Sequence, residues 1–219
     1  MPVADLSRAL TDPDPSGLEP NLARAATLLE DADTADLLGD LLDGSPAAEA
    51  LLPEIEAVDH VGAITLASTE EARAALESVG FDERLRLFES TILTRELTRL
   101  ARGDGQGVPV SLLKAWGRSG CAAELAMPAG VETECLAEWI RAGVGAHLAF
   151  RVVDLRQLSD AEELLASAGF RHPAGVGPGP QINPEEGIAA AFFERRPAQP
   201  LGLELCHYVK GPLSRALGE

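Results

Sequence analysis

Two stretches of the chain decide the fold: AVDHVGAITL at residues 57–66 and AHLAFRVVDL at residues 146–155. Each is an apolar run of strand length, bounded by small or polar residues, and each carries one histidine, His60 or His147. Similar sequence at two places in one chain indicates an internal repeat. The chain is therefore expected to use one structural unit twice.

The residues that follow each stretch define this unit. The spacing S-x-x-E, which caps a helix reciprocally, occurs at 68–71 and again at 159–162. Each predicted helix ends at a glycine followed by phenylalanine, at 80–81 and at 169–170. Irregular, strand-compatible sequence then leads to a last apolar run in each unit. The expected unit is one strand, one helix and about three further strands.

The last apolar runs carry the second pair of polar residues. They read CAAELAMP, with Glu124, and LGLELCHY, with Glu204. His60 precedes Glu124 by 64 residues, and His147 precedes Glu204 by 57. The two distances agree closely enough to place the four residues at equivalent positions of the repeat.

Strand alternation predicts which side chains share a strand face with these four residues. Successive side chains of a strand point to opposite faces. Across the four runs the His or Glu shares its face mostly with small residues, and most of the bulky apolar residues fall on the other face. The bulky face is expected to pack under the helices, and the small residues leave room beside the polar groups.

The four polar groups together favour a metal site. A carboxylate among apolar strand residues carries a large desolvation penalty unless a cation pairs with it, and the short runs offer only Arg151. Two His and two Glu suit Zn²⁺, Ni²⁺, Mn²⁺, Co²⁺ or Fe²⁺ and leave positions for water or substrate. Taken singly, a strand histidine is more often a core residue and a strand glutamate a solvated one. Their coincidence in the repeat favours the metal.

Composition narrows the class of partner. The net charge of −17 disfavours nucleic acid and anionic membrane surfaces, which would repel the chain. Three cysteines without a C-x-x-C pair support neither a disulfide framework nor a zinc ribbon. The N-terminus lacks the pattern of a signal peptide, and no apolar run reaches 18 residues. We expect a soluble cytoplasmic protein with a small-molecule substrate.

The first 56 residues differ from the rest. They hold thirteen Asp or Glu against Arg8 and Arg24, a net charge of −11, which leaves −6 for the other 163 residues. Leucines at helical spacing predict short helices there, with Thr34 capping one and Ser45 beginning another. The expected organisation is an acidic helical N-terminal extension, a first module, a linker, a second module and a tail, at 1–56, 57–130, 131–143, 144–210 and 211–219.

On these runs, their order and their spacing, the chain resembles the vicinal-oxygen-chelate superfamily, also called glyoxalase/bleomycin-resistance/dioxygenase, over residues 57–208. The resemblance implies an α+β fold with two βαβββ modules that form an open, cup-shaped sheet around a metal. It places ligands on the first and last strand of each module, here His60, Glu124, His147 and Glu204. In ligand order the chain is similar to bacterial-type glyoxalase I and, with Glu for Gln at the second position, to methylmalonyl-CoA epimerase.

The resemblance implies a metal-dependent isomerase, epimerase or lyase that moves a proton next to a carbonyl group. Glu204 is then a ligand and the first candidate for the base, and Glu124 the second. Two alternatives stay open: a protein that sequesters a small molecule, and an extradiol-type Fe(II) dioxygenase, in which Glu124 would be dispensable. A homodimer also stays open, because members of the superfamily build the cup within one chain or across two.

Three more residues are candidates for contact with substrate: Arg151, Arg195 and Cys206. Arg195 ends a predicted strand and can pair with a substrate anion, although a solvated strand end is the plainer interpretation. Cys206 shares the face of Glu204, where it can equally be a small buried filler. Outside the runs, 103–107 is predicted as a hairpin turn and 175–187 as a loop that borders the pocket.

Overall fold

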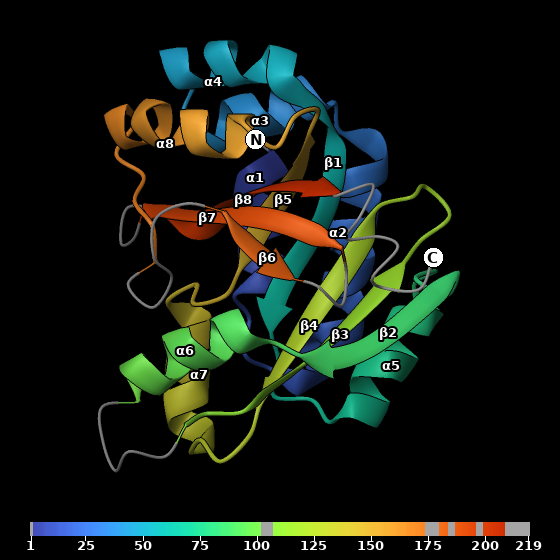
Figure 1. Cartoon of the computed structure of the whole chain (residues 1–219). Helices are drawn as coiled ribbons and strands as arrows, with labels where there is room; N and C mark the ends of the chain where they lie inside the picture. The colour runs from blue at the N-terminus through green and yellow to red at the C-terminus, as the bar shows by residue number, and fades with distance from the viewer. Residues whose placement is uncertain (1, 102–106, 174–179, 184–186, 196–198, 209–219) are drawn as a thin grey trace.

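The computed structural model describes residues 2–101, 107–173, 180–183, 187–195 and 199–208. Within these residues eight strands form one mixed sheet, in the order β2-β3-β4-β1-β5-β8-β7-β6 (Figure 1). The chain passes through the sheet as two successive units, and each occupies one half of it. The predicted α+β fold with two modules is therefore confirmed.

Both units contain a strand, a helix and three further strands. The first comprises β1 (Ile55–Ile64), α5 (Thr69–Ser78), β2 (Arg84–Glu89), α6 (Thr91–Leu100), β3 (Val110–Trp116) and β4 (Ala122–Pro128). The second comprises β5 (His147–Val152), α8 (Gln157–Ser167), β6 (Gln181–Asn183), β7 (Ile188–Arg195) and β8 (Gln199–Tyr208). In each, the first and last strands are parallel neighbours, β1 with β4 and β5 with β8.

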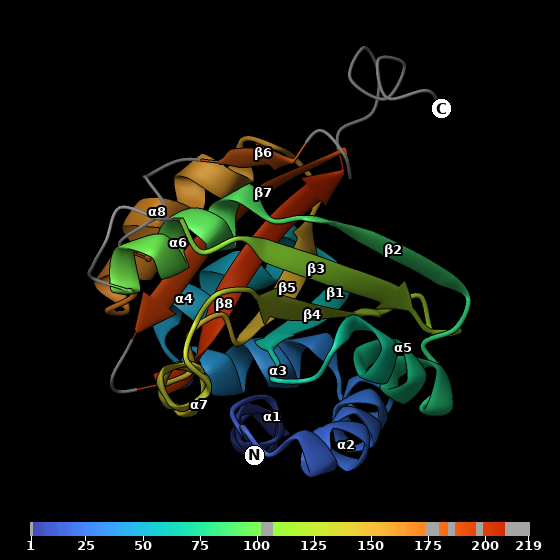
Figure 2. The same cartoon turned by 90° about the horizontal axis from the view of Figure 1, so that it is seen from below.

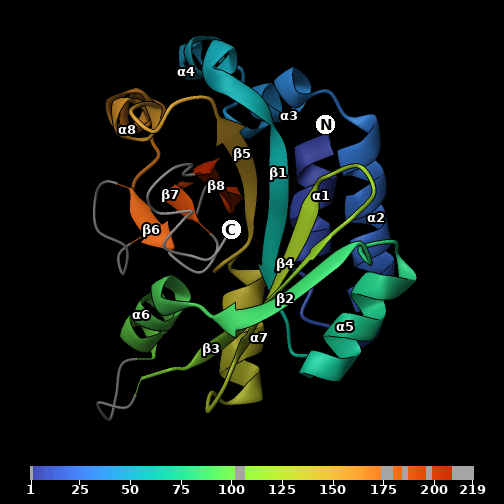
Figure 3. The same ribbon diagram turned by 45° about the vertical axis from the view of Figure 1, so that its right-hand side comes forward.

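The two units meet where β1 pairs with β5 in antiparallel fashion. This pairing makes one continuous sheet, and the strand order is the same when it is read outward from β1 or from β5. Figure 3 shows the sheet curling from β2 and β3 through β1 and β5 to β7 and β6, with α1, α2 and α5 outside the curl. The cup is thus built within a single chain.

The N-terminal extension covers part of the convex face of the sheet. It contains α1 (Pro2–Leu10), η1 (Pro15–Gly17), α2 (Leu18–Asp31), α3 (Thr34–Leu41), α4 (Pro46–Leu51) and η2 (Leu52–Glu54). In Figure 2, α1, α2 and α5 lie along one side of the sheet and α6 lies on the other. Leucines of the extension join the bulky face of the strands in one core, which includes Leu6, Leu22, Leu38, Leu125, Leu148 and Leu203.

Two helices were not expected. The helix α6 occupies part of the long stretch between β2 and β3 that the sequence predicted as strand-compatible, and α7 (Thr133–Arg141) occupies the predicted linker. Both are amphipathic, and they share a second core with Ile64, Val110 and Ala126. Their apolar residues recur at helical spacing, and this period was the available signal. No helix in the described part of the chain is long and apolar enough to cross a membrane.

The helix starts agree with the sequence prediction in one unit and differ in the other. Ser68 and Glu71 form the predicted reciprocal capping box at the start of α5. The box predicted at 159–162 is wrong, because α8 begins three residues earlier, after Arg156, whose backbone N–H donates a hydrogen bond to Asp154. In the extension, Asp33 caps α3 in place of Thr34. The turn predicted at 103–107 lies outside the described residues except for Gly107, as does most of the loop at 175–187.

Because the extension shares the core of the sheet, we expect it to unfold together with the modules. Leu38 is 1% exposed, and Leu38→Ala should lower the free energy of unfolding of the whole chain by about 2–5 kcal/mol. Fluorescence during denaturation measures this, since both tryptophans, Trp116 and Trp139, lie outside the extension. Leu52, 38% exposed, provides the matched control, and Leu52→Ala should cost less than about 1 kcal/mol. A fluorescence transition that Leu38→Ala leaves in place would show that the extension folds independently.

Candidate metal centre

The four predicted ligands lie on four adjacent strands, β4, β1, β5 and β8, which form the middle of the sheet. Two neighbouring rows of paired residues cross these strands. One row reads Glu124, Gly62, His147, Gly202, and the other reads Ala122, His60, Ala149, Glu204. In each row small residues separate the polar ones. The strand-face pattern seen in the sequence thus becomes a patch in which each large polar side chain has space over its neighbour.

Gly62 provides this space for His147. A Cβ atom at position 62 would lie 2.0 Å from Cε1 of the His147 ring, which no contact allows. The ring is fixed on its other side, where Nδ1–H donates a hydrogen bond of 2.9 Å to the carbonyl oxygen of Gly145. A carbonyl only accepts, so Nδ1 carries the hydrogen and the lone pair of the neutral ring is on Nε2. Nε2 is the atom that approaches the other predicted ligands.

Three donor atoms form a nearly equilateral triangle. His60 Nε2 lies 3.1 Å from His147 Nε2 and 3.4 Å from Glu204 Oε2, and His147 Nε2 lies 3.2 Å from the same oxygen. Two ligands each about 2.1 Å from one ion lie roughly 3.0 Å apart at a right angle and roughly 3.4 Å apart at the tetrahedral angle. The donor set and its spacing therefore fit a divalent transition metal ion.

Asp59 orients His60 from behind. Its Oδ2 lies 2.9 Å from His60 Nδ1, and both side chains are 1% exposed. Arg151 donates two hydrogen bonds to Oδ1, at 3.1 and 2.7 Å, and the Tyr208 hydroxyl donates one to Oδ2 at 3.1 Å. A carboxylate bound to the far nitrogen of a histidine fixes the tautomer and raises the basicity of the metal-binding nitrogen. Asp59 thus makes Nε2 of His60 a better ligand.

The sequence interpretation missed Asp59 because strict alternation places it on the opposite face from His60. The structure has a register shift in the β1–β5 pairing between Val58 and His60. Such a bulge bends the strand locally and redirects a side chain. Asp59 and His60 can therefore both contact groups on the concave face, although they are consecutive in the sequence.

Glu124 has a different environment from Glu204. Its Oε1 lies 3.5 Å from His60 Nε2 but 2.6 Å from the Nζ atom of Lys114, a lysine that is 0% exposed. Lys114 pairs directly with Glu124 across β3 and β4. Glu124 also lies outside the group whose ligand atoms all fall within 4.8 Å of one another, which contains His60, His147 and Glu204. The sequence missed Lys114 because it lies on another strand.

The buried carboxylates hold positive charge at the centre of the site. Burial alone would lower the pKa of His60, but the charges of Glu124 and Glu204 and the hydrogen bond to Asp59 outweigh burial and the charge of Lys114, and raise it to about 10. Burial likewise opposes ionisation of Glu204, yet the histidines hold its pKa well below the usual value. The site thus favours a cation between these groups, and a metal ion supplies one.

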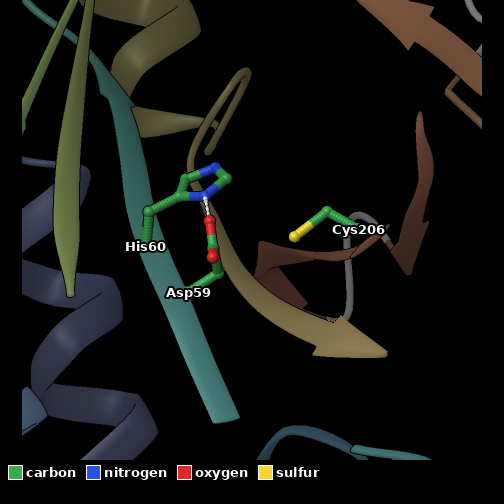
Figure 4. Close-up of side chains that lie close together, drawn as sticks. All are labelled: Asp59, His60 and Cys206. Carbon is green, nitrogen blue, oxygen red and sulfur yellow. Dashed lines mark hydrogen bonds and ion pairs between the residues drawn. The ribbon is translucent and has the colours of Figure 1, made fainter. Parts of the chain in front are cut away.

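A second cluster of possible donors, Asp59, His60 and Cys206, is better explained without a metal (Figure 4). The oxygens of Asp59 are already engaged by His60, Arg151 and Tyr208. Burial also raises the pKa of the Cys206 thiol well above its usual value, so the sulfur keeps its proton and is a poor ligand. This cluster therefore supports the first site from behind.

A pocket opens on three of the four predicted ligands, Glu124, His147 and Glu204. It holds about 100 Å³ of space open to water. Its polar lining includes Glu96, Glu124, His147, Glu194 and Glu204, and its apolar walls include Phe88, Ile92, Leu93, Leu112, Ile188 and Phe192. Helix α6 forms one of these walls. The described lining residues include no lysine or arginine, so they offer an anionic substrate group no cationic partner.

The three predicted substrate contacts lie elsewhere, and none is among the described residues that line the pocket. Arg195 lies over the Phe170 ring and contacts Asp43 of the extension. Arg151 is held by Asp59 and lies over the Tyr208 ring. Cys206 is fully buried. These positions give a role in substrate contact no support, and they explain the residues by packing and charge pairing.

No family model and no curated protein matches the sequence. Solved structures with some similarity include methylmalonyl-CoA epimerase from Mycobacterium tuberculosis, at 21% identity and a TM-score of 0.44, over 71% of this chain and 90% of that one. A variant of the Streptomyces coelicolor methylmalonyl-CoA epimerase with 2-nitronate-propionyl-CoA shows 17% identity and a TM-score of 0.41, over 71% and 99%. A hypothetical protein from Bacillus halodurans C-125 shows 16% and 0.42, over 70% and 95%. At these TM-scores the likenesses carry no argument about activity.

The contact between Gly62 and His147 makes a direct prediction. In Gly62→Ala the new methyl group displaces the His147 ring, so affinity for Zn²⁺ or Co²⁺ should fall by about tenfold or more. Competition with a chromophoric chelator measures this. Gly39 provides the control, because nothing lies within 4 Å of a Cβ there, and Gly39→Ala should leave the affinity unchanged. Equal affinity in both variants would contradict the assigned position of the ring.

Proposed function

We propose that this chain is a divalent-metal-dependent isomerase or epimerase that moves a proton next to a carbonyl group of a small substrate; a lyase using the same proton transfer is included. The observation that carries the proposal is the convergence of His60, His147 and Glu204, of which His147 and Glu204 line a largely apolar pocket beside a further carboxylate, Glu124. Of the four ligands that the resemblance implies, His60, His147 and Glu204 are thus close donors, and Glu124 lies beside them.

A bound divalent ion would supply a Lewis acid that stabilises negative charge on a substrate oxygen. His60, His147 and Glu204 would hold it, with His60 oriented by Asp59. The carbon acid needs a base within reach, and Glu124 and Glu204 are carboxylates that line the pocket at this point. A substrate that fills the pocket would displace water from between the apolar walls, and this would strengthen electrostatic interactions in the site.

The pocket favours a compact substrate with a carbonyl or hydroxyl group and an apolar body. The walls contributed by Phe88, Leu93 and Phe192 can bury such a body. Because the described lining has no lysine or arginine, the pocket is unsuited to a phosphate-bearing group inside the cup. We therefore propose a neutral small molecule as substrate, with any charged portion outside the described walls.

One observation favours a second candidate, an extradiol-type Fe(II) oxygenase. The three close donors are two histidines and one carboxylate, a set that non-haem Fe(II) oxygenases use on one face of the ion. This candidate predicts bound iron, consumption of O₂ and full activity without Glu124. The isomerase predicts no O₂ consumption and a requirement for a pocket carboxylate.

The proposal is tested first by metal content. After gentle purification the chain should carry about one divalent ion, detected by elemental analysis. His60→Ala and His147→Ala should each abolish binding of the ion, because each removes one of the three donor atoms. His207→Ala is the matched control, since the Nδ1 atom of His207 bonds to the backbone oxygen of Val152, away from the donor triangle, and this variant should retain the ion.

Proton transfer is tested separately. The protein with its divalent ion bound should catalyse exchange with solvent deuterium in an α-hydroxy carbonyl or acyl thioester compound that fits the pocket. The proton that exchanges is the one next to the carbonyl group, and NMR follows the exchange. The third candidate, sequestration, predicts an apolar compound bound by protein without any ion. The enzyme proposal would be overturned if the purified chain takes up no divalent ion at micromolar concentration and still binds an apolar compound.

A further inference from the structure

Glu124 and Glu204 occupy equivalent positions of the repeat but have different neighbours. In the first unit the residue paired with Glu124 on the outer neighbouring strand is Lys114, on β3. In the second unit the equivalent residue, paired with Glu204 on β7, is Phe192. The Phe192 ring lies edge-on to His147, with centroids 6.3 Å apart. One glutamate thus faces a cation and the other an aromatic ring, although both occupy the same position of the repeat.

The cation is held firmly at Glu124. Lys114 is fully buried, and its Nζ lies 2.6 Å from Glu124 Oε1 and 4.0 Å from Asp59 Oδ2. The ammonium also lies 5.4 Å from the centroid of the Trp116 ring, within range of a cation–π interaction. A buried ammonium group carries a large desolvation penalty away from its anions. Lys114 therefore stays with the carboxylates.

This contact decides what Glu124 can bind. Glu204 Oε2 approaches both histidine nitrogens, at 3.4 and 3.2 Å, whereas Glu124 approaches only His60, at 3.5 Å, and is closer to Lys114. An ammonium at 2.6 Å from the carboxylate competes with a metal ion for the same oxygen and repels the ion. Glu124 still lines the pocket, where a substrate can reach it.

We propose that Lys114 is a positioning residue: it keeps Glu124 out of the metal's ligand set and holds it as the carboxylate that exchanges a proton with substrate, while Glu204 binds the metal. The proposal rests on the proposed function and assigns the base within it. It reverses the order expected from the resemblance, in which Glu204 was the first candidate for the base.

The step balances without any further reactant. The carbon–hydrogen bond next to the carbonyl breaks, the proton goes to the Glu124 carboxylate, and the electron pair stays on the substrate as an enolate. The same carboxyl group then delivers the proton to the former carbonyl carbon of an α-hydroxy carbonyl substrate, while the hydroxyl proton moves to the former carbonyl oxygen, and the net change is an isomerisation. Lys114 remains an ammonium throughout, and it balances the charge that Glu124 loses and regains.

Binding of Co²⁺ alone tests the assignment, because its visible absorption reports ligand number and type. Lys114→Met removes the charge but keeps the chain length, so Glu124 should join the ion. We expect Co²⁺ affinity to rise by about tenfold or more and the absorption spectrum to change. In the double variant Lys114→Met with Glu124→Gln both effects should disappear. Glu124→Gln alone should change Co²⁺ affinity by less than about threefold and leave the spectrum as in the parent.

The Co²⁺ measurements can contradict the inference in two ways. If Glu124→Gln alone weakens Co²⁺ binding by about tenfold or more, Glu124 is a ligand and the inference is wrong. The inference is also wrong if Lys114→Met folds and its affinity and spectrum equal those of the parent. Should Lys114→Met fail to fold, Glu124→Gln decides alone. A parent protein that binds no Co²⁺ refutes the proposed function instead, so the two failures are distinguishable.

Discussion

The antiparallel pairing of β1 with β5 is the contact on which the site depends. It brings His60 and His147, 87 residues apart in the chain, to diagonally neighbouring positions, and it sets Gly62 opposite His147, beneath its ring. A shift of one residue in this register would send every side chain of one strand to the other face. The buried leucines on the convex side oppose such a shift, since it would expose them. Packing on one face thus fixes chemistry on the other.

The sequence predicted the fold because the fold follows from periods that a single chain displays, and the same periods indicated the candidate site residues. The repeat marked equivalent positions, and alternation identified the face of His60, Glu124, His147 and Glu204. The structure brings all four together. The helical extension packed on the sheet also followed from leucine spacing. Local patterns of this kind need no knowledge of which strands are neighbours.

What the sequence could not predict depends on pairing across strands. The contact between Lys114 and Glu124 depends on the β3–β4 register, which places the two residues opposite each other. Asp59 depends on a bulge that breaks the alternation used to assign faces. The helix α6, which forms one wall of the pocket, was not predicted, because the stretch between β2 and β3 is also compatible with strands. The partners of Arg195 and Arg151, which are Asp43 and Asp59, likewise lie on other elements, so no local pattern in the sequence indicates these pairs.

The presence of both halves of the cup in one chain has an evolutionary consequence. When a cup forms from two identical subunits, a two-fold axis copies every substitution to both sides, so a lysine beside one glutamate brings a lysine beside the other. A duplicated chain is free of that constraint. Here one half carries Lys114 and the other Phe192 at matching positions, and α6 has no counterpart among the residues of the second half that the structure describes. Covalent duplication therefore allows a symmetric scaffold to present two unlike walls to an unsymmetrical substrate.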